Sequence, residues 1–277
     1  MAEYNFTFAI DCDEVLRKTL DRMIELYNEN FNADKKREDV NDFMVEKSFP
    51  DIEPATGMTA SKWFFQEHST ELFLDVEAFP YIKEDIETLR KYGKVIILTY
   101  QKSYLNKIQT LQWLDNNGIE ADGVCFLKDK TLLTADYLVD DNDWNFGGSH
   151  VKHGILINAP YNISKDVEDV RRTSCSCVTM DRCENLHEFV EKFTGAIKAL
   201  EEVQSKYPVR DRFYILKDAV PYVESGYRRE TRYFCKAGEK VRVSHYFISG
   251  IKAYVRITCV HGWGDVCVDV NDLKKYI

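Results

Sequence analysis

The sequence predicts an α/β protein with a mostly parallel sheet, a small helical insertion after the first strand, and a small C-terminal all-β unit. Three observations favour this fold class. Short apolar runs alternate with amphipathic runs of helical spacing up to residue 204. Residues 32–78 interrupt the alternation with irregular polar stretches that are rich in aromatic residues. After Pro208 the pattern changes to short alternating runs separated by glycines, which is typical of a small antiparallel barrel. We therefore expect two domains, residues 1–204 and 205–277.

The elements of the first domain follow from its periodicity. Buried strands are expected at residues 4–10, 94–100, 123–127, 135–139, 154–158 and 176–180. Helices are expected at residues 14–30, 81–92, 103–117 and 184–204. Apolar strands that alternate with helices imply right-handed crossovers, and so a parallel sheet that is covered on both faces.

The second domain differs from the first in charge. Residues 205–277 carry a net charge of +6 and residues 1–204 a net charge of −15, within a total of −9. Its aromatic residues are Tyr207, Tyr214, Tyr222, Tyr227, Tyr233, Phe234, Tyr246, Phe247, Tyr254 and Trp263, and its interleaved basic residues include Arg228, Arg229, Arg232, Lys236, Lys240, Arg242, Lys252 and Arg256. Such a surface could bind a nucleic acid strand or a nucleotide. The alternatives are an ordinary core with a solvated face, and an oligomerisation module. The rhythm of the strands resembles an SH3-like barrel, which says little about function.

Composition narrows the function classes. No apolar run approaches the 18 residues that a membrane span needs, so no membrane partner is expected. The N-terminus lacks a basic region followed by an apolar stretch, which argues against a signal peptide. The eight cysteines show no repeating frame and fit reduced thiols. These observations favour a cytoplasmic protein.

Polar side chains that suit phosphate and metal chemistry follow four of the expected strands. In order they are Asp11 and Asp13, then Thr99, then Lys128 and Lys130, then Asp140 and Asp141. Because ligands bind at the carboxyl ends of strands in open α/β sheets, we expect these groups to meet. Carboxylates can hold Mg²⁺, or one can attack a phosphorus centre while another moves the proton. A hydroxyl and an ammonium can neutralise phosphoryl oxygens. Taken singly, each of these residues could also be an ordinary polar residue at a strand end or in a surface turn.

With these motifs the chain resembles the haloacid dehalogenase superfamily of phosphotransferases. The match lies at Asp11 to Val15, at Leu98 and Thr99, at Lys130, and at Leu138 to Asp141. More narrowly, residues 127–141, 73–80 and 160–162 are similar to the 5′(3′)-deoxyribonucleotidase family, and the resemblance covers roughly residues 5–195. It implies a Rossmann-like sheet with residues 32–78 as a helical cap.

The resemblance also implies roles for the motif residues. Asp11 would be the nucleophile that forms an aspartyl-phosphate, and Asp13 would protonate the leaving oxygen and then deprotonate water. Thr99 and Lys130 would hold the phosphate, and Lys128 would lie near the substrate. Mg²⁺ would be bound by Asp11, Asp13 (through its backbone carbonyl) and Asp141, with Asp140 acting through water.

Two positions depart from the family pattern, and one group of cap residues has two interpretations. Glu14 stands where the family usually has glycine, which could narrow the substrate range or weaken activity. Tyr100 stands where serine is usual, so it would reshape the phosphate side of the pocket as a substrate-binding residue. In the cap, Trp63 and Phe64, with Phe65, could stack on a base, or they could form the cap's own core.

The expected function is that of a cytoplasmic, Mg²⁺-dependent phosphomonoesterase that acts on (deoxy)nucleoside 5′-monophosphates. One alternative is a phosphatase for nucleic-acid ends, with residues 205–277 presenting the strand. Another is a nucleotide-binding protein without turnover. A small phosphate ester is the expected partner, nucleic acid is a further possibility, and an oligomer is possible.

Overall fold

The computed structural model describes residues 4–147, 150–174, 177, 179–209, 213–217, 237–259 and 265–277. The chain divides into two compact units, one of residues 2–190 and one of residues 191–277. Within the part of the chain that is described, no helix is both long enough and apolar enough to cross a membrane.

The first unit is built on a six-stranded parallel sheet with the order β3-β2-β1-β4-β5-β6. The strands are β1 (Phe6–Ile10), β2 (Gly93–Thr99), β3 (Gly123–Phe126), β4 (Thr134–Asp140), β5 (His150–Ile157) and β6 (Thr179–Cys183). Strand β1 lies inside the sheet, and Ile10 is in register with Ile97 of β2 and with Val139 of β4. Its apolar residues Phe8 to Ile10 are completely buried, as a strand covered on both faces requires.

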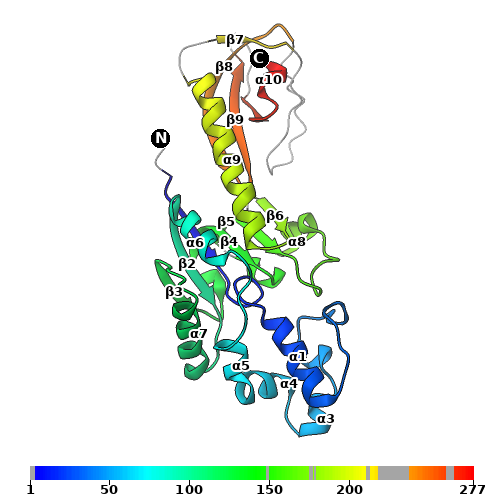
Figure 1. Ribbon diagram of the computed structural model, residues 1–277. Helices are drawn as coiled ribbons and strands as arrows, with labels where there is room; N and C mark the ends of the chain where they lie inside the picture. Colours follow the sequence, from blue (N-terminus) through cyan, green and yellow to red (C-terminus); the bar gives the residue numbers. More distant parts are fainter. Residues whose placement is uncertain are drawn as a thin grey trace. The chain divides into compact units, whose positions relative to one another are not determined.

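Helices connect the parallel strands of this sheet, and a further helix follows its last strand (Figure 1). They are α6 (Ile82–Arg90), α7 (Tyr104–Asn116), α8 (Val167–Ser174) and α9 (Leu186–Lys206), with short 3₁₀ turns η3 (Lys130–Leu132) and η4 (Asp143–Phe146). A side-chain hydroxyl of Ser103 caps α7, and Gly118 follows its end with φ +63°. The predicted α/β class with a parallel sheet is confirmed.

A helical cap follows β1, as predicted, but its core also includes the helix at Thr19–Phe31, which precedes the predicted residues 32–78. It contains α1 (Thr19–Phe31), η1 (Arg37–Asp39), α2 (Val45–Ser48), α3 (Ile52–Thr56), α4 (Ala60–Lys62), the π-helical turn η2 (Trp63–Glu67) and α5 (Ser69–Phe73). Figure 1 shows α1, α3, α4 and α5 gathered beyond the carboxyl ends of the strands. The cap has a core of its own, formed by buried side chains of α1 and of the short helices. It therefore stands as a packed body next to the strand ends.

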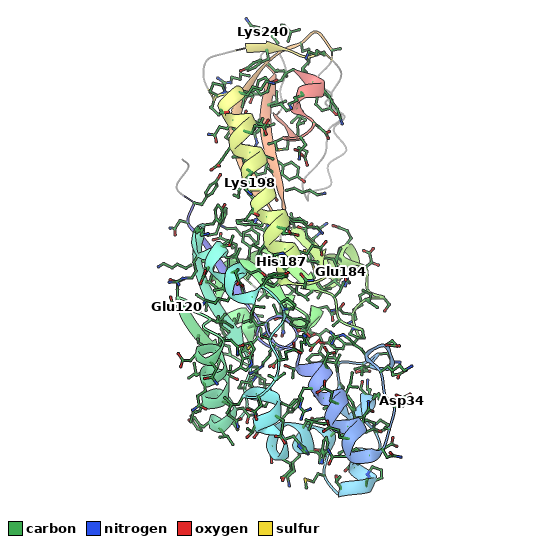
Figure 2. The ribbon with its side chains drawn as sticks, in the orientation of Figure 1. Asp34, Glu120, Glu184, His187, Lys198 and Lys240 are labelled. Atoms are coloured by element: carbon green, nitrogen blue, oxygen red, sulfur yellow. The ribbon has the colours of Figure 1, made fainter. Side chains whose placement is uncertain are left out.

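The second unit holds a four-stranded antiparallel sheet with the order β10-β9-β8-β7. Its elements are β7 (Phe213–Ile215), β8 (Lys240–Ser249), β9 (Lys252–Cys259), β10 (Asp265–Asp269) and α10 (Leu273–Tyr276). Figure 2 labels Lys198 on α9 and Lys240 at the start of β8, both in this unit. The core joins Ala196, Leu200 and Val203 of α9 to the strands, so the C-terminal part of this helix packs with the β unit. The prediction of a small C-terminal β unit is confirmed.

Much of the predicted basic and aromatic surface lies outside the described residues, namely Tyr222, Tyr227, Arg228, Arg229, Arg232, Tyr233, Phe234, Lys236 and Trp263. Nucleic-acid binding and oligomerisation therefore stay predictions.

The expectation of reduced thiols holds at four described cysteines and fails at a fifth. Cys12, Cys125, Cys183 and Cys267 are free. Cys177 is disulfide-bonded, so the prediction of reduced thiols is wrong at this position.

Candidate active site

The loop after β1 places Asp11 at the carboxyl end of the sheet. The Asp11 backbone N–H donates to the Val139 carbonyl at 2.9 Å, which continues the pairing with β4 by one residue. The chain then turns sharply, because the Leu16 and Arg17 N–H groups both donate to the carbonyl of Cys12. The Asp11 side chain, only 7% exposed, accepts from the Cys12 N–H at 2.8 Å. Its carboxylate is thus fixed just past the end of the strand.

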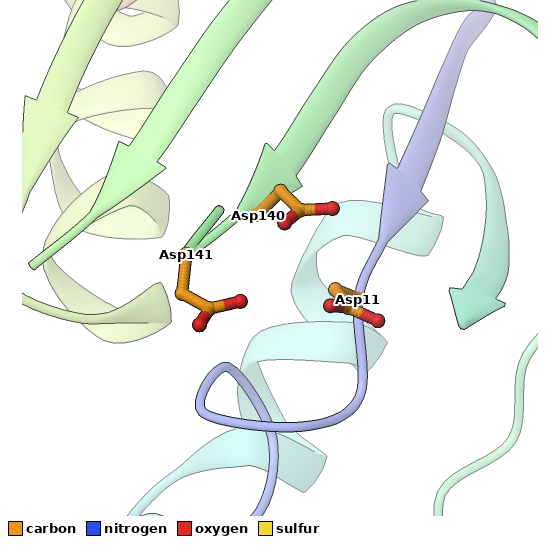
Figure 3. A group of neighbouring side chains, drawn as sticks. All are labelled: Asp11, Asp140 and Asp141. Carbon is orange, nitrogen blue, oxygen red and sulfur yellow. The ribbon is translucent and has the colours of Figure 1, made fainter. Parts of the chain in front are cut away.

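Two further carboxylates come from the end of the neighbouring strand β4. Asp140 is its last residue, and Asp141 follows directly. Figure 3 shows the side chains of Asp11, Asp140 and Asp141 directed toward a common point. One ligand oxygen from each of the three lies within 4.8 Å of the others, and all three residues are buried. The predicted meeting of β1 and β4 polar groups at this edge is therefore observed.

Lys130 lies between two of these carboxylates. Its Nζ is 2.9 Å from Asp11 Oδ2 and 2.6 Å from Asp140 Oδ2. Burial alone would lower the pKa of Lys130, but the two carboxylates outweigh burial and raise it. Asp140 also accepts from the Asn142 N–H and from the Asn145 side-chain amide, both at 2.9 Å. The lysine is therefore a fixed, permanently charged cation.

One lysine does not balance three buried carboxylates. Burial raises the pKa of Asp11 to about 7, with Lys130 opposing this and Asp140 adding to it. Burial, then Asp140 and Asp11, raise the pKa of Asp141 well above its usual range. Closely spaced carboxylate oxygens with excess negative charge are the donor set that hard divalent cations prefer. A cation there would also favour the ionised forms of these carboxyls. The residues therefore fit Mg²⁺.

This charge balance predicts a pH dependence of stability in the absence of divalent cations. Between its ordinary pKa of 3.8 and about 7, Asp11 holds a proton in the folded state that the unfolded chain has lost. The free energy of unfolding should therefore fall as pH rises through this window, by at most about 1.4 kcal/mol per pH unit for one group. Urea unfolding in a chelator across this window measures the slope. Asp11→Asn should flatten it, and an equal slope in that variant would contradict the assignment to Asp11.

Asp13 has a different environment from Asp11. Its Oδ1 accepts from Arg17 Nε at 2.8 Å and from Thr19 Oγ1 at 2.7 Å, and its Oδ2 accepts from Gln101 Nε2 at 2.9 Å. Burial would raise the pKa of Asp13, but the Arg17 guanidinium and these hydrogen bonds outweigh burial and lower it. The surroundings of Asp13 therefore favour its ionised form, whereas those of Asp11 favour its protonated form. Sequence reasoning did not identify Arg17 or Gln101.

The remaining predicted phosphate-binding residues lie at neighbouring positions. Thr99 ends β2, is buried, and accepts through its backbone carbonyl from the Leu127 N–H at 3.0 Å. Tyr100 follows it and is 44% exposed. Lys128 is exposed, two residues before the buried Lys130. The structure brings Asp11, Lys130, Asp140 and Asp141 into one cluster. Among the described residues, no hydrogen bond or ion pair joins Tyr100 or Lys128 to that cluster.

Trp63 and Phe64 lie in the core of the cap. Phe64 is fully buried and Trp63 nearly so. Trp63 packs on Phe31 and on His68, and Phe64 packs on Phe49. The structure places both rings in the arrangement of a cap core, which was one of the two interpretations that the sequence left open.

The loop after β5 supports Asp141. The Tyr161 hydroxyl donates to Asp141 Oδ2, and the Asn162 side-chain amide donates to the Asp141 carbonyl at 2.6 Å. Arg182 of β6 in turn donates to Asn162 Oδ1 at 2.9 Å. The Tyr161 ring contacts Phe43 of the cap, with ring centroids 5.4 Å apart. These contacts orient a candidate metal ligand, as outer-shell partners do in metal sites.

Glu14 occupies a strained backbone position. Its φ is +58°, in the left-handed region that favours glycine. The buried carboxylate accepts from the Leu20 N–H at 2.6 Å, at the start of α1, and lies 2.5 Å from Arg37 of the cap. Arg37 also pairs with Asp21. The side chain thus links the loop after β1 to the cap in two places, which offsets the backbone strain.

Comparing two truncations of Glu14 isolates the strain. Both Glu14→Gly and Glu14→Ala remove the carboxylate, but only glycine adopts φ +58° freely. We expect the glycine variant to be the more stable by about 1–2 kcal/mol, the reverse of the usual order. Urea unfolding of the two proteins measures the difference. An alanine variant at least as stable as the glycine variant would show that position 14 is not strained.

Comparison with known proteins identifies the family. Residues 5–176, more than half of the chain, match the family described as 5′ nucleotidase, deoxy (Pyrimidine), cytosolic type C protein. With its parallel sheet, helical cap and acidic site at the strand ends, the chain belongs to this nucleotidase family. The resemblance to a deoxyribonucleotidase family that the sequence predicted is thereby confirmed.

A curated relative and two solved structures are similar to parts of the chain. A "Putative 5'(3')-deoxyribonucleotidase" of Chlorobaculum tepidum is 26% identical over 110 residues, which are 38% of this chain and 54% of that protein. The chain thus spans about half the length of this curated relative. Among solved structures, a haloacid dehalogenase-like family hydrolase from Streptococcus pneumoniae has a TM-score of 0.47 at 13% identity, covering 68% of this chain and 98% of that one. A haloacid dehalogenase-like family hydrolase from Xanthomonas campestris has a TM-score of 0.42 at 14% identity, covering 74% and 100%.

Proposed function

We propose that the protein is a Mg²⁺-dependent phosphomonoesterase that hydrolyses (deoxy)nucleoside 5′-monophosphates. The observation that carries the proposal is the buried cluster of Asp11, Lys130, Asp140 and Asp141 in a member of a nucleotidase family. The description of that family as cytosolic supports a cytosolic location as part of the proposal.

The proposed reaction has two displacements at phosphorus. An Asp11 carboxylate oxygen bonds to phosphorus while the bond to the 5′-oxygen breaks. Asp13 takes up a proton when the anionic phosphate binds beside it, and it gives that proton to the 5′-oxygen. Asp13 then takes a proton from water, whose oxygen bonds to phosphorus and releases Asp11 and inorganic phosphate. Splitting one displacement into two easier ones is the benefit of a covalent intermediate. Lys130 and Thr99 would neutralise phosphoryl oxygens.

The proposed metal site uses the residues with the right donor atoms. Asp11, Asp141 and the backbone carbonyl of Asp13 would hold Mg²⁺, with Asp140 acting through water. When bound, the cation supplies positive charge that offsets the carboxylates and the phosphate. Asp140 would also keep Lys130 in place through its 2.6 Å ion pair.

Substrate selection is proposed to involve exposed groups beside this cluster. Lys128 and Tyr100 are exposed on the loops that follow β3 and β2, where they can reach a bound nucleotide. A stacking role for Trp63 and Phe64 would require the cap core to open, because both rings are buried there.

The test is phosphate release from a panel of ribo- and deoxyribonucleoside 5′- and 3′-monophosphates, with Mg²⁺ and with a chelator. Release from a few 5′-monophosphates that depends on Mg²⁺ is the expected result, and it would also identify the base. No phosphate release from any nucleotide of the panel would overturn the proposal. In that case, phosphate release from a phosphorylated oligonucleotide would indicate a nucleic-acid end phosphatase. Nucleotide binding that calorimetry detects without phosphate release would indicate a binding protein without turnover.

A further inference from the structure

Arg17 is a fully buried guanidinium with a fixed partner on every nitrogen. Nε donates to Asp13 Oδ1 at 2.8 Å, Nη1 to the Phe73 carbonyl at 2.9 Å, and Nη2 to Thr110 Oγ1 at 3.3 Å. Its guanidinium carbon lies 4.9 Å from the Phe73 ring centroid and 5.5 Å from that of Trp113. The partners come from the end of the cap and from α7, so the guanidinium plane has little freedom.

The two oxygens of Asp13 are held unequally. Oδ1 accepts from the charged Arg17 and from the Thr19 hydroxyl, at 2.8 and 2.7 Å. Oδ2 accepts from the neutral Gln101 amide at 2.9 Å, its one partner among the described residues. Hydrogen bonds from charged donors are about twice as strong as neutral ones. Oδ2 is therefore the oxygen that can exchange its partner for a substrate atom.

We propose that Arg17 is a positioning residue which, with Thr19, anchors Asp13 Oδ1, so that Oδ2 is the oxygen that passes the proton to the leaving 5′-oxygen. The inference rests on the proposed function and deepens it. Anchoring one oxygen fixes the plane of the carboxylate and therefore the direction of the other oxygen. Small errors in the orientation of a reacting group lower the reaction rate strongly. Lysine cannot replace the arginine fork, because it offers a single nitrogen in place of three in one plane.

Comparing two substrates with different leaving groups separates a positioning role of Arg17 from a general effect on the stability of the fold. A nucleoside leaves as a basic alkoxide and needs the proton, whereas p-nitrophenolate leaves without one. In Arg17→Lys, single-turnover release of nucleoside should fall by about 10–100-fold. The single-turnover burst of p-nitrophenol from p-nitrophenyl phosphate, which reports only the first displacement, should change by less than about 3-fold. Arg90→Lys, the same change at a surface ion pair with Glu120, is the matched control.

A further variant keeps the inference falsifiable. Thr19→Val removes the second donor to Oδ1 without removing a buried charge, so it tests the anchor even where Arg17→Lys fails to fold; it should shift the ratio of the two rates in the same direction. Equal loss on both substrates in Arg17→Lys or Thr19→Val would overturn the positioning role. Absence of release from both substrates by the wild-type protein would overturn the proposed function instead.

Discussion

Replacing Asp11 with Asn is expected to lower nucleotide phosphate release by at least about 10³-fold, since removing a nucleophile usually costs this much or more. The amide has nearly the same shape as the carboxylate but no negative oxygen that can form a stable bond to phosphorus. Its oxygen can still accept from the Cys12 N–H, which contacts Asp11 at 2.8 Å. The variant should therefore fold normally and lose only chemistry. Initial rates with the best substrate of the nucleotide panel measure the effect.

The same variant has a second readout that does not depend on activity. Asn removes one of three buried carboxylates around a single lysine, so at about pH 8 in a chelator it should be as stable as the wild type or more stable. A variant that is destabilised under these conditions would make its loss of activity uninformative. Activity within about 10-fold of wild type would instead show that Asp11 is not the nucleophile.

The sheet and the acidic cluster could be predicted because both depend on local pattern. Short apolar runs mark the parallel strands, and the carboxyl ends of parallel strands meet at one edge, so Asp11 and Asp140 could be paired across 129 residues of sequence without knowledge of the loops. Element boundaries were less predictable. Helix α1 was expected from residue 14, but the backbone of residues 12–17 turns upon itself, and the helix begins at Thr19.

Contacts that depend on the packing of distant segments could not be predicted. Arg17 reads as an ordinary surface residue of an amphipathic helix, yet its partners Phe73 and Thr110 lie 56 and 93 residues away. The role of Trp63 was ambiguous for the same reason. The same sequence pattern fits an aromatic side chain that packs in a core and one that faces a ligand. The positive φ of Glu14 could not be predicted from composition either. The usable signal was that Glu14 stands at a position where the resembled family usually has glycine.

Removing the charge of Lys130 is expected to cost about 3–5 kcal/mol of unfolding free energy in a chelator at about pH 8, the usual result of leaving a buried charge unpaired. In Lys130→Met, Asp11 and Asp140 would face each other without the ammonium that now lies 2.9 and 2.6 Å from them. The loss should be smaller at about pH 5, because Asp11, with a pKa of about 7, is then protonated and relieves the repulsion.

Urea unfolding with and without Mg²⁺ measures this effect, and Lys128→Met is the matched control. Lys128 is exposed two residues away, so its replacement should change stability by less than about 0.5 kcal/mol. Mg²⁺ should recover part of the Lys130→Met loss, because a cation bound among Asp11, Asp140 and Asp141 replaces some of the missing positive charge and stabilises the folded state by mass action. If Mg²⁺ stabilises neither the variant nor the wild type, the three carboxylates do not form a metal site, and protonation relieves their excess negative charge instead.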